Sequence, residues 1–581
     1  MATPGTYGAN WTRAMNRITA RRAAWARPVT AFVSSPEPRT IGSFARGRQL
    51  SAGNFLFAGH LIERPDLAIW DLNPPGPTFE AEMHGFGWLD DLAAAGDGPA
   101  RACAREWTWE WIARHGGGRG PGWTPDLTGR RLIRWINHAL FLLTGQDRAV
   151  SDPFYRSLAQ QTLFLGKRWH ATAPGLPRFE ALTGLIYAGL ALEGMEGHVA
   201  PAARALGREC EAHIGEAGVL PTRNPEELLD VFTLLTWAAA ALDESGTPPP
   251  PSLTAATQRI APTLRTLRHS DGGLARFHGG GRGLEGRLDT ALAASGVKGR
   301  QPDGLAMGYA RLSAGRTSLI IDAAPPPSGA ASAGAHASAM AFELTSGRRP
   351  VIVNCGSGAS FGVEWRRAGR ATPSHSTLVV AGESSARLGA TGTDAEWLTH
   401  GPSDVPIQMS HASDGLRFEG GHDGYVRRFG LTHARTIEMT FDGRGVAGED
   451  MLLAMDLEDK RRFDAAMDTH AMQGVPYQIH FHLHPEVDAN IDMGGAAVSL
   501  ALRSGEIWVF RTDARARISL EPSVYLEKSR LKPRAGKQIV LSGRALEYAD
   551  RIRWSLAKAQ DTPISIRDLA QDAPFPAPDD D

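Results

Sequence analysis

The hydrophobic period of this chain changes once, near residue 305, and that change limits the possible folds more than any other feature. Before it, apolar residues recur every three or four positions, as in RRLIRWINHALFLLTG and PEELLDVFTLLTWAAAAL, which is the period of an amphipathic helix. After it, short β-branched runs such as RPVIVNCG and KQIVLSG end in turn residues, which is typical of strands. A helical half therefore precedes a β half.

The chain is predicted to be an α+β multidomain protein. Its 581 residues exceed what one hydrophobic core usually holds. Regular helical hairpins favour a solenoid or a closed (α/α) toroid, and successive strands without intervening helices favour an antiparallel β-sandwich. The predicted parts are a basic N-terminal segment at 1–50, the toroid at 51–304, the sandwich at 305–565 and an acidic disordered tail at 566–581.

Composition argues against several functional classes. Lys and Arg number 62 and Asp and Glu number 63, so the chain lacks the basic excess of a nucleic-acid binder. Cys103, Cys210 and Cys355 are isolated, which indicates free thiols and no disulfide framework or thiolate metal site. No apolar stretch approaches the roughly 20 residues of a membrane helix, and the Arg-rich N-terminus does not have the pattern of a secretory signal. The sequence by itself thus favours a cytoplasmic protein.

Five ordered elements of the β half resemble the C-terminal signature of the heparinase II/III-like polysaccharide lyases. They are Ala333–Ser338, Phe342–Arg349, Asn354-Cys355-Gly356, Trp365-Arg366-Arg367 and His375-Ser376-Thr377. The resemblance runs from about residue 305 to 560, and it continues more weakly into the helical half through WTPDLTGRRLIRWINHALFLL and RNPEELLDVFTLL. It implies a toroid followed by a sandwich, and a location in the periplasm or cell envelope.

The resemblance also implies an enzyme, a carbon–oxygen lyase that cleaves a uronate-containing acidic polysaccharide by β-elimination. Such chemistry needs a group that neutralises the carboxylate, a base for the C5 proton and an acid for the leaving oxygen. In the family an Asn or His neutralises the carboxylate, a toroid Tyr acts as acid or base, and a sandwich His assists. Some members hold Zn in the sandwich through His and Asp.

This sequence departs from the family pattern at several of these positions. Gly334 stands where the family has the first His of its His-x-His turn, Asn354 replaces the Asp, and Ser376 replaces an Asn. In the toroid, 175–178 and 221–226 stand where the Asn/His pair and the Tyr are expected. Two alternatives therefore stay open: a non-catalytic polysaccharide-binding protein of the same fold, and a glycoside hydrolase that uses Glu226 or Glu227 with a second acid.

Five residues are the predicted catalytic candidates. His336 and His375 offer imidazoles that titrate near neutrality. Arg223 and Asn224 precede a helix, where a substrate carboxylate would be stabilised, although Asn224 could equally be only the helix cap. Tyr425 is a candidate base, because a phenol beside cations can have a lowered pKa.

The predicted substrate-binding residues are polar or aromatic groups near these candidates. They are Trp123, Arg131, Trp135, Asn137, His278, Arg367, His422 and Arg435. No cofactor is required by the predicted chemistry. A possible Zn site is His336, Asn354 and His375, for which two imidazoles and an oxygen ligand would supply part of a four-coordinate shell; the alternative is a hydrogen-bonded structural His pair.

Overall fold

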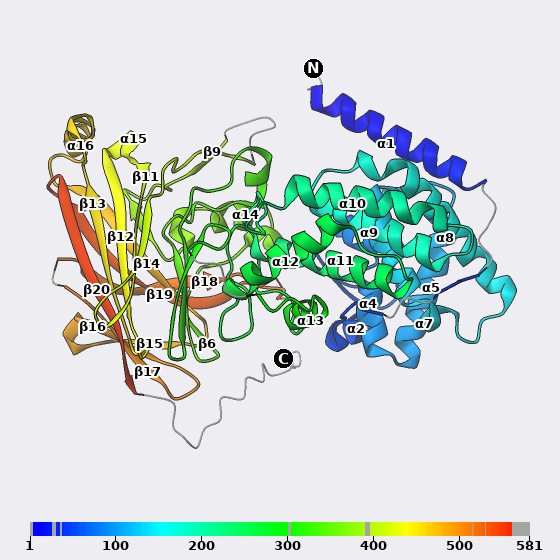
Figure 1. Cartoon of the computed structure of the whole chain (residues 1–581). Helices are drawn as coiled ribbons and strands as arrows, with labels where there is room; N and C mark the ends of the chain where they lie inside the picture. The colour runs from blue at the N-terminus through cyan, green and yellow to red at the C-terminus, as the bar shows by residue number, and fades with distance from the viewer. Residues whose placement is uncertain are drawn as a thin grey trace.

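The computed structural model describes residues 4–25, 31–34, 38–299, 304–389, 396–513, 515–528 and 530–560. The chain forms two halves that lie side by side, a helical half and a β half (Figure 1). This arrangement confirms the predicted fold class, a helical toroid followed by an antiparallel sandwich. The predicted tail at 566–581 lies outside the described residues.

The helical half consists of a β-hairpin and a series of helices. Its elements are α1 (Pro4–Ala23), α2 (Phe44–Ser51), β1 (Asn54–Phe57), β2 (His60–Glu63), α3 (Pro77–Gly85), α4 (Trp88–Ala95), α5 (Gly98–His115), α6 (Pro125–Asn137), α7 (Ala139–Leu143), α8 (Arg148–Arg168), α9 (Leu176–Ala191), α10 (Val199–His213), α11 (Pro225–Glu244), α12 (Pro251–Thr266) and α13 (Arg287–Ala294). None of the helices in the described part of the chain is long and apolar enough to cross a membrane.

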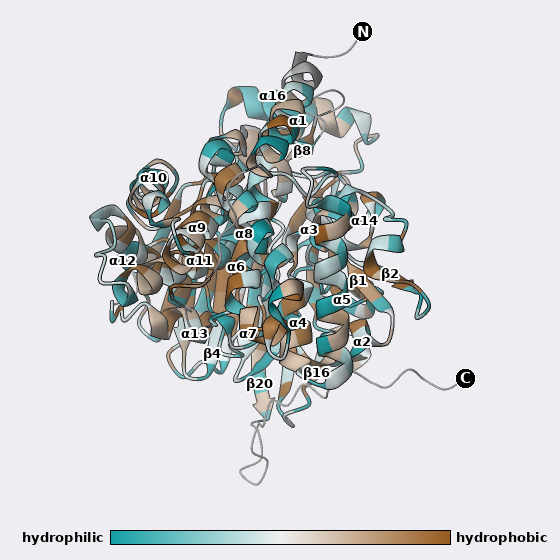
Figure 2. Cartoon of the chain, turned by 90° about the vertical axis from the view of Figure 1, so that its right-hand side faces the viewer, coloured by the Kyte–Doolittle hydropathy of each residue, from teal (hydrophilic) through white to brown (hydrophobic). Residues whose placement is uncertain are grey.

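Helices α6, α9 and α11 form the middle of this half, and their apolar segments are brown in Figure 2. Helix α9 is buried along almost its whole length. Helices α6 and α9 can approach closely because glycines face each other there. A Cβ at Gly129 would lie 2.3 Å from the Glu180 carbonyl oxygen, and one at Gly184 would lie 2.5 Å from the Gly129 Cα.

The β half is built from two antiparallel sheets. One has the order β10 (Ile407–His411), β11 (Gly415–Tyr425), β12 (Leu431–Thr440), β13 (Gly445–Leu453), β20 (Ala549–Gln560), β17 (Ile507–Thr512), β16 (Ala497–Ala501) and β15 (Asp488–Asp492). The other has the order β18 (Arg517–Tyr525), β19 (Arg534–Ala545), β14 (Val475–Leu483), β6 (Arg349–Val353), β5 (Phe342–Ser346), β4 (Thr317–Asp322) and β3 (Tyr309–Ala314), with β7 (Leu378–Val380) also paired to β14. A separate two-stranded ribbon joins β8 (Arg387–Leu388) and β9 (Leu398–His400).

The sandwich core lies between these two sheets. Strand β12 alternates buried and half-buried residues along its whole length, as expected for a strand with one face on a core. Across the core, the rings of Phe342 and Trp554 stack with centroids 5.7 Å apart.

Short helices interrupt the β half, which the strand pattern did not predict. They are α14 (Val363–Gly369), α15 (Val426–Phe429) and α16 (Leu457–Thr469). The Asp456 side chain caps α16 by accepting from the backbone N–H groups of Glu458 and Asp459. This Asp followed by acidic residues in the first turn is a helix-start signal that could have been recognised in the sequence.

Arg223 connects the two halves. It precedes α11, and its guanidinium contacts the first strands of the sandwich. Nη2 donates to Asp322 Oδ1 at 2.5 Å and to the Gly308 carbonyl at 2.9 Å, and Nε donates to the Met307 carbonyl at 3.1 Å. The Tyr309 hydroxyl donates back to the Arg223 carbonyl at 2.6 Å. Both charged side chains are almost fully buried, so the ion pair is part of the packed junction.

We expect Gly129→Ala to destabilise the helical half. The added methyl group would overlap the α9 backbone, and overpacking of this kind typically costs about 1–3 kcal/mol. Gly98→Ala is the matched control, because a Cβ there meets nothing within 4 Å. Thermal unfolding of the two variants tests this, and equal melting temperatures would contradict the close approach of α6 and α9.

We expect Arg223→Ala to lower the free energy of unfolding by about 3–5 kcal/mol, because it leaves the buried Asp322 carboxylate without its partner. The double variant Arg223→Ala/Asp322→Asn removes that charge and should recover part of the loss. Denaturant unfolding measures both variants. A single variant as stable as the parent chain would show that the ion pair does not hold the junction.

Candidate functional site

Three of the predicted histidines meet next to this junction. The His336 backbone N–H donates to His278 Nδ1 at 3.1 Å, and His336 Nδ1 lies 3.0 Å from His375 Nε2. His278 Nε2 in turn lies 3.4 Å from Asp322 Oδ2. A continuous polar chain therefore runs from Arg223 through Asp322 and the three histidines, and we call these five residues the junction chain.

The hydrogen bonds of the junction chain determine where its protons lie. His375 Nδ1 lies 2.9 Å from the Ala371 carbonyl, which can only accept, so His375 carries its proton on Nδ1 and accepts at Nε2. His336 Nδ1 must then donate to His375, which leaves the proton-accepting position of His336 at Nε2. Among the described residues, Nε2 of His336 has no hydrogen-bond partner.

The histidines of the junction chain are held neutral. Burial, followed by the charges of His375 and His278, lowers the pKa of His336 well below its usual value. Burial lowers the pKa of His375 to about 4, against the opposing effect of the Ala371 carbonyl. For Asp322, burial opposes ionisation, but Arg223 and then His278 outweigh it and keep the pKa of the carboxyl below its usual range.

The predicted Zn ligands do not form a full ligand set. His336 and His375 offer two close nitrogen atoms, but the Asn354 side chain is committed elsewhere, since its Oδ1 accepts from the Ser376 backbone N–H at 3.0 Å. Within the described ranges, no group of three or more His, Cys, Asp or Glu is placed to hold a metal. These residues match the hydrogen-bonded His pair better than a four-coordinate Zn site, so the Zn site stays a prediction.

Asn224 takes the alternative role that the sequence left open for it. Its Oδ1 accepts from the backbone N–H groups of Glu226 and Glu227 at 3.0 and 3.2 Å, so it caps α11. Glu226 is bound by Lys528 and by the Gly281 backbone N–H. The Lys528 contact ties the start of α11 to the sandwich, and together with the Gly281 N–H it occupies Glu226, one of the two alternative acids proposed for a glycoside hydrolase.

Tyr425 does not have the environment predicted for a base. Its hydroxyl donates to the Leu378 carbonyl at 2.8 Å, and burial raises its pKa, opposite to the expected lowering. His422 contacts His433 Nδ1 at 3.2 Å, and Arg435 donates to Asp450 at 2.7 Å. All of these groups lie inside the sandwich, where backbone carbonyls and buried side chains engage them, although Arg435 Nη2 has no hydrogen-bond partner among the described residues.

The aromatic and polar residues predicted to bind sugar in the toroid lie in its core. Trp135 is fully buried and stacks on Phe154, and Trp123 donates to the His115 carbonyl at 2.9 Å. Arg131 is fully buried over the Trp111 ring at 4.0 Å, and burial lowers its pKa to about 9. The buried Asn137 amide has no hydrogen-bond partner in the described structure. Arg131 and Trp135 are four residues apart on α6, and that face of the helix is buried in the toroid core.

Arg367, one of the predicted substrate-binding residues, lines a sizeable cavity. This cavity holds about 420 Å³ between α14, the ribbon β8–β9 and α15.

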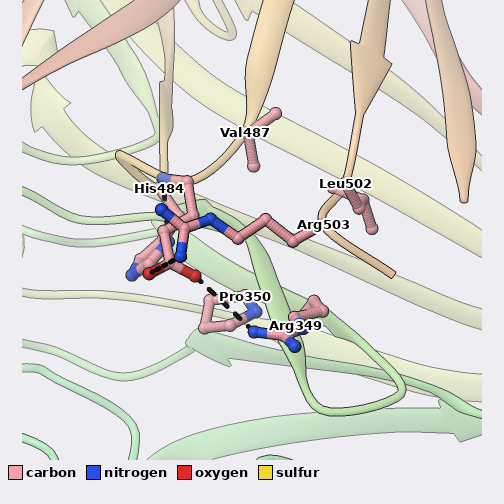
Figure 3. A pocket seen from close by; sticks show the side chains of 7 residues that line it. Arg349, Pro350, His484, Val487, Leu502 and Arg503 are labelled. Carbon is pink, nitrogen blue, oxygen red and sulfur yellow. Dashed lines mark hydrogen bonds and ion pairs between the residues drawn. The ribbon is translucent and has the colours of Figure 1, made fainter. Parts of the chain in front are cut away.

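A second depression, beside β6, holds only about 10 Å³, about the space of one water. Figure 3 shows its lining, where Arg349 and Arg503 both pair with Glu486. The other arginines of the larger cavity, Arg370, Arg387 and Arg428, were not predicted.

We expect the chain to lose stability as the pH falls from about 6.5 to about 4. The pKa of His375 and of His482 is about 4 in the folded state and about 6.5 in an unfolded chain. The unfolded state therefore binds more protons than the folded state below pH 6.5, so the free energy of unfolding decreases as the pH is lowered. Denaturant midpoints measured across this range test the sign, and a midpoint that stays constant or rises would contradict neutral buried histidines.

Comparison with known proteins gives one family. Residues 297–555 match the family model described as heparinase II/III-like, C-terminal. The chain is 30% identical over 552 residues to FtsZ-localized protein C of Caulobacter vibrioides, covering 93% of this chain and 92% of that protein.

Solved structures of polysaccharide lyases share the fold. A crystal structure of heparinase III matches with a TM-score of 0.67 at 14% identity, covering 95% of this chain and 90% of that one. A mutant of the heparan sulfate lyase HepC from Pedobacter heparinus matches with a TM-score of 0.56 at 14% identity, covering 95% and 89%. Together with the family model and the full-length relative, these matches show that the chain belongs to the heparinase II/III-like family.

Proposed function

We propose that this chain is a non-catalytic member of its family that acts together with FtsZ in bacterial cell division. The proposal places the chain in the compartment that holds FtsZ, in place of the cell envelope that the family resemblance implies. Its first support is the 30% identity to FtsZ-localized protein C across nearly the whole of both chains, which leaves neither half of the chain outside the comparison.

The observation that carries the non-catalytic part is that the three predicted acid–base groups are buried, while Arg223 and Asn224 are occupied by other contacts. His336 is 2% exposed, His375 is 0% exposed and Tyr425 is 1% exposed. Arg223, the group predicted to neutralise the substrate carboxylate, is already paired with Asp322. A general base must come within hydrogen-bond reach of the proton that it removes, and the burial of these three side chains opposes such a contact with a polymer.

A second candidate function, β-elimination on an acidic polysaccharide, is favoured by one feature of the junction chain. His336 is neutral and its Nε2 lone pair has no partner among the described residues, as a general base requires. The proton on His336 Nδ1 is directed to His375, which fixes the tautomer. Opening of the junction would have to expose this atom before it could act on a uronate.

Association with FtsZ can be tested with purified proteins. We expect the chain to sediment with FtsZ polymers formed with GTP and to stay in the supernatant when FtsZ is kept unpolymerised with GDP. A fluorescent fusion should give a band at mid-cell that disappears when FtsZ is depleted. A chain that never sediments with FtsZ and shows no mid-cell band would contradict this part of the proposal.

Absence of lyase activity is tested separately with heparan sulfate, chondroitin sulfate and alginate. The expected result is no rise in ultraviolet absorbance, because elimination would leave a conjugated double bond. His336→Ala is the diagnostic variant. A rise with the parent chain that is lost in His336→Ala would overturn the non-catalytic proposal and support elimination with His336 as base.

A further inference from the structure

The larger cavity is lined mainly by positive charge, and we call it the arginine pocket. Its walls are formed by Arg367, Arg370, Ala371, Glu383, Ser384, Ala386, Arg387, Leu388, Leu398 and Arg428. Four arginines thus face one glutamate in a space of about 420 Å³, which is within the range of pockets that hold small molecules. Apart from Arg367, no residue of this lining was predicted to take part in the elimination chemistry.

Arg370 supplies a buried charge with little compensation. It is 4% exposed, and its guanidinium donates mainly to neutral carbonyls, those of Ala335 at 2.7 Å and Ser332 at 2.8 Å. Its carboxylate contact is with Glu396, 3.5 Å away and half exposed. Burial and then the neighbouring Arg366 lower the pKa of Arg370 to about 10. The half-exposed Glu396 compensates this buried cation only in part, burial of an incompletely paired charge is costly, and an anion in the pocket would offset more of that cost.

The remaining arginines are arranged around the opening. Arg387 and Arg428 share the single carboxylate of Glu383, and their side chains are 51% and 56% exposed. Arg367 is exposed, and its side chain has neither a hydrogen bond nor an ion pair to any described residue. The Arg367 guanidinium is therefore available to a ligand, and the exposed Arg387 and Arg428 are held beside the opening by their shared contact with Glu383.

We propose that the arginine pocket is a binding site for a small organic polyanion that carries carboxylate or phosphate groups. Guanidinium groups bind both kinds of anion through paired N–H donors, and several separated guanidiniums select a ligand with more than one negative group. The Leu388, Leu398 and Ala386 side chains provide apolar wall for the carbon skeleton of such a ligand. This site is independent of the proposed function, and it would stand whether or not the chain acts with FtsZ.

The experiment is isothermal titration calorimetry of the full chain with citrate and with pyrophosphate, at constant ionic strength, and with sucrose as the uncharged control. We expect at least one of the two anions to bind and sucrose not to bind. Binding of citrate alone would identify a carboxylate ligand, and binding of pyrophosphate alone a phosphate ligand. Absence of binding by both anions would overturn the proposal.

Two variants assign the binding to the pocket. Arg367→Gln and Arg387→Gln should each weaken it by roughly 10-fold to 100-fold, the effect of losing one charge-assisted hydrogen bond. Arg148→Gln on α8 is the control, because it removes the same charge from a side chain that is 84% exposed. This helix belongs to the helical half, whereas the pocket lies in the β half. All three positions are surface-exposed, so thermal unfolding should be unchanged. If all three variants weaken anion binding equally, or if none of them weakens it, the result would contradict a specific site.

Discussion

The ion pair between Arg223 and Asp322 is the interaction on which the junction of the two halves depends. Arg223 belongs to the helical half and Asp322 ends a sandwich strand, so neither can be satisfied if the halves separate. Every donor of the guanidinium is directed at the sandwich, to Asp322 and to the carbonyls of Met307, Gly308, Ala324 and Pro325. The junction is therefore set by directional bonds and by apolar packing together.

The charge of this pair also determines the state of the histidines beside it. Asp322 stays ionised because Arg223 is adjacent, and it draws His278 toward it. His278 then accepts the His336 backbone N–H, and His336 is directed to His375. The result is a set of neutral, buried imidazoles with defined protons. In this chain, residue types that can serve an elimination reaction instead hold the two halves together.

The sequence predicted the two halves well, because helical and strand periods differ and the change near residue 305 is abrupt. It also predicted that His336 and His375 come together, since the family resemblance placed both in one site. It did not predict α16, whose capping residue Asp456 was not recognised as a helix start. Nor could it identify Trp135 as a core residue, because a helical period shows which residues share a face but not what that face meets; Trp123 precedes α6 and lies outside any such period.

The arginine pocket was hidden from the sequence for a different reason. Arg367, Arg370, Arg387 and Arg428 span three separate elements, and only the fold brings them to one cavity. The Trp365-Arg366-Arg367 element indicated Arg367 alone, because a local motif carries no information about its neighbours in space. Local patterns identify residues within one helix or strand, whereas a pocket made by a helix, a ribbon and a second short helix depends on tertiary packing.

The central claim is that the junction histidines are closed to solvent and serve structure, and chemical modification tests it most directly. Treatment of the native chain with diethylpyrocarbonate, followed by peptide mass analysis, reports which imidazoles a small reagent can reach. The exposed His60 provides the internal reference for full reactivity. Rapid modification of His60 and much slower modification of the buried His336 and His375 are expected. Modification of His336 at a rate similar to that of His60 would contradict it, and would show an imidazole open to substrate.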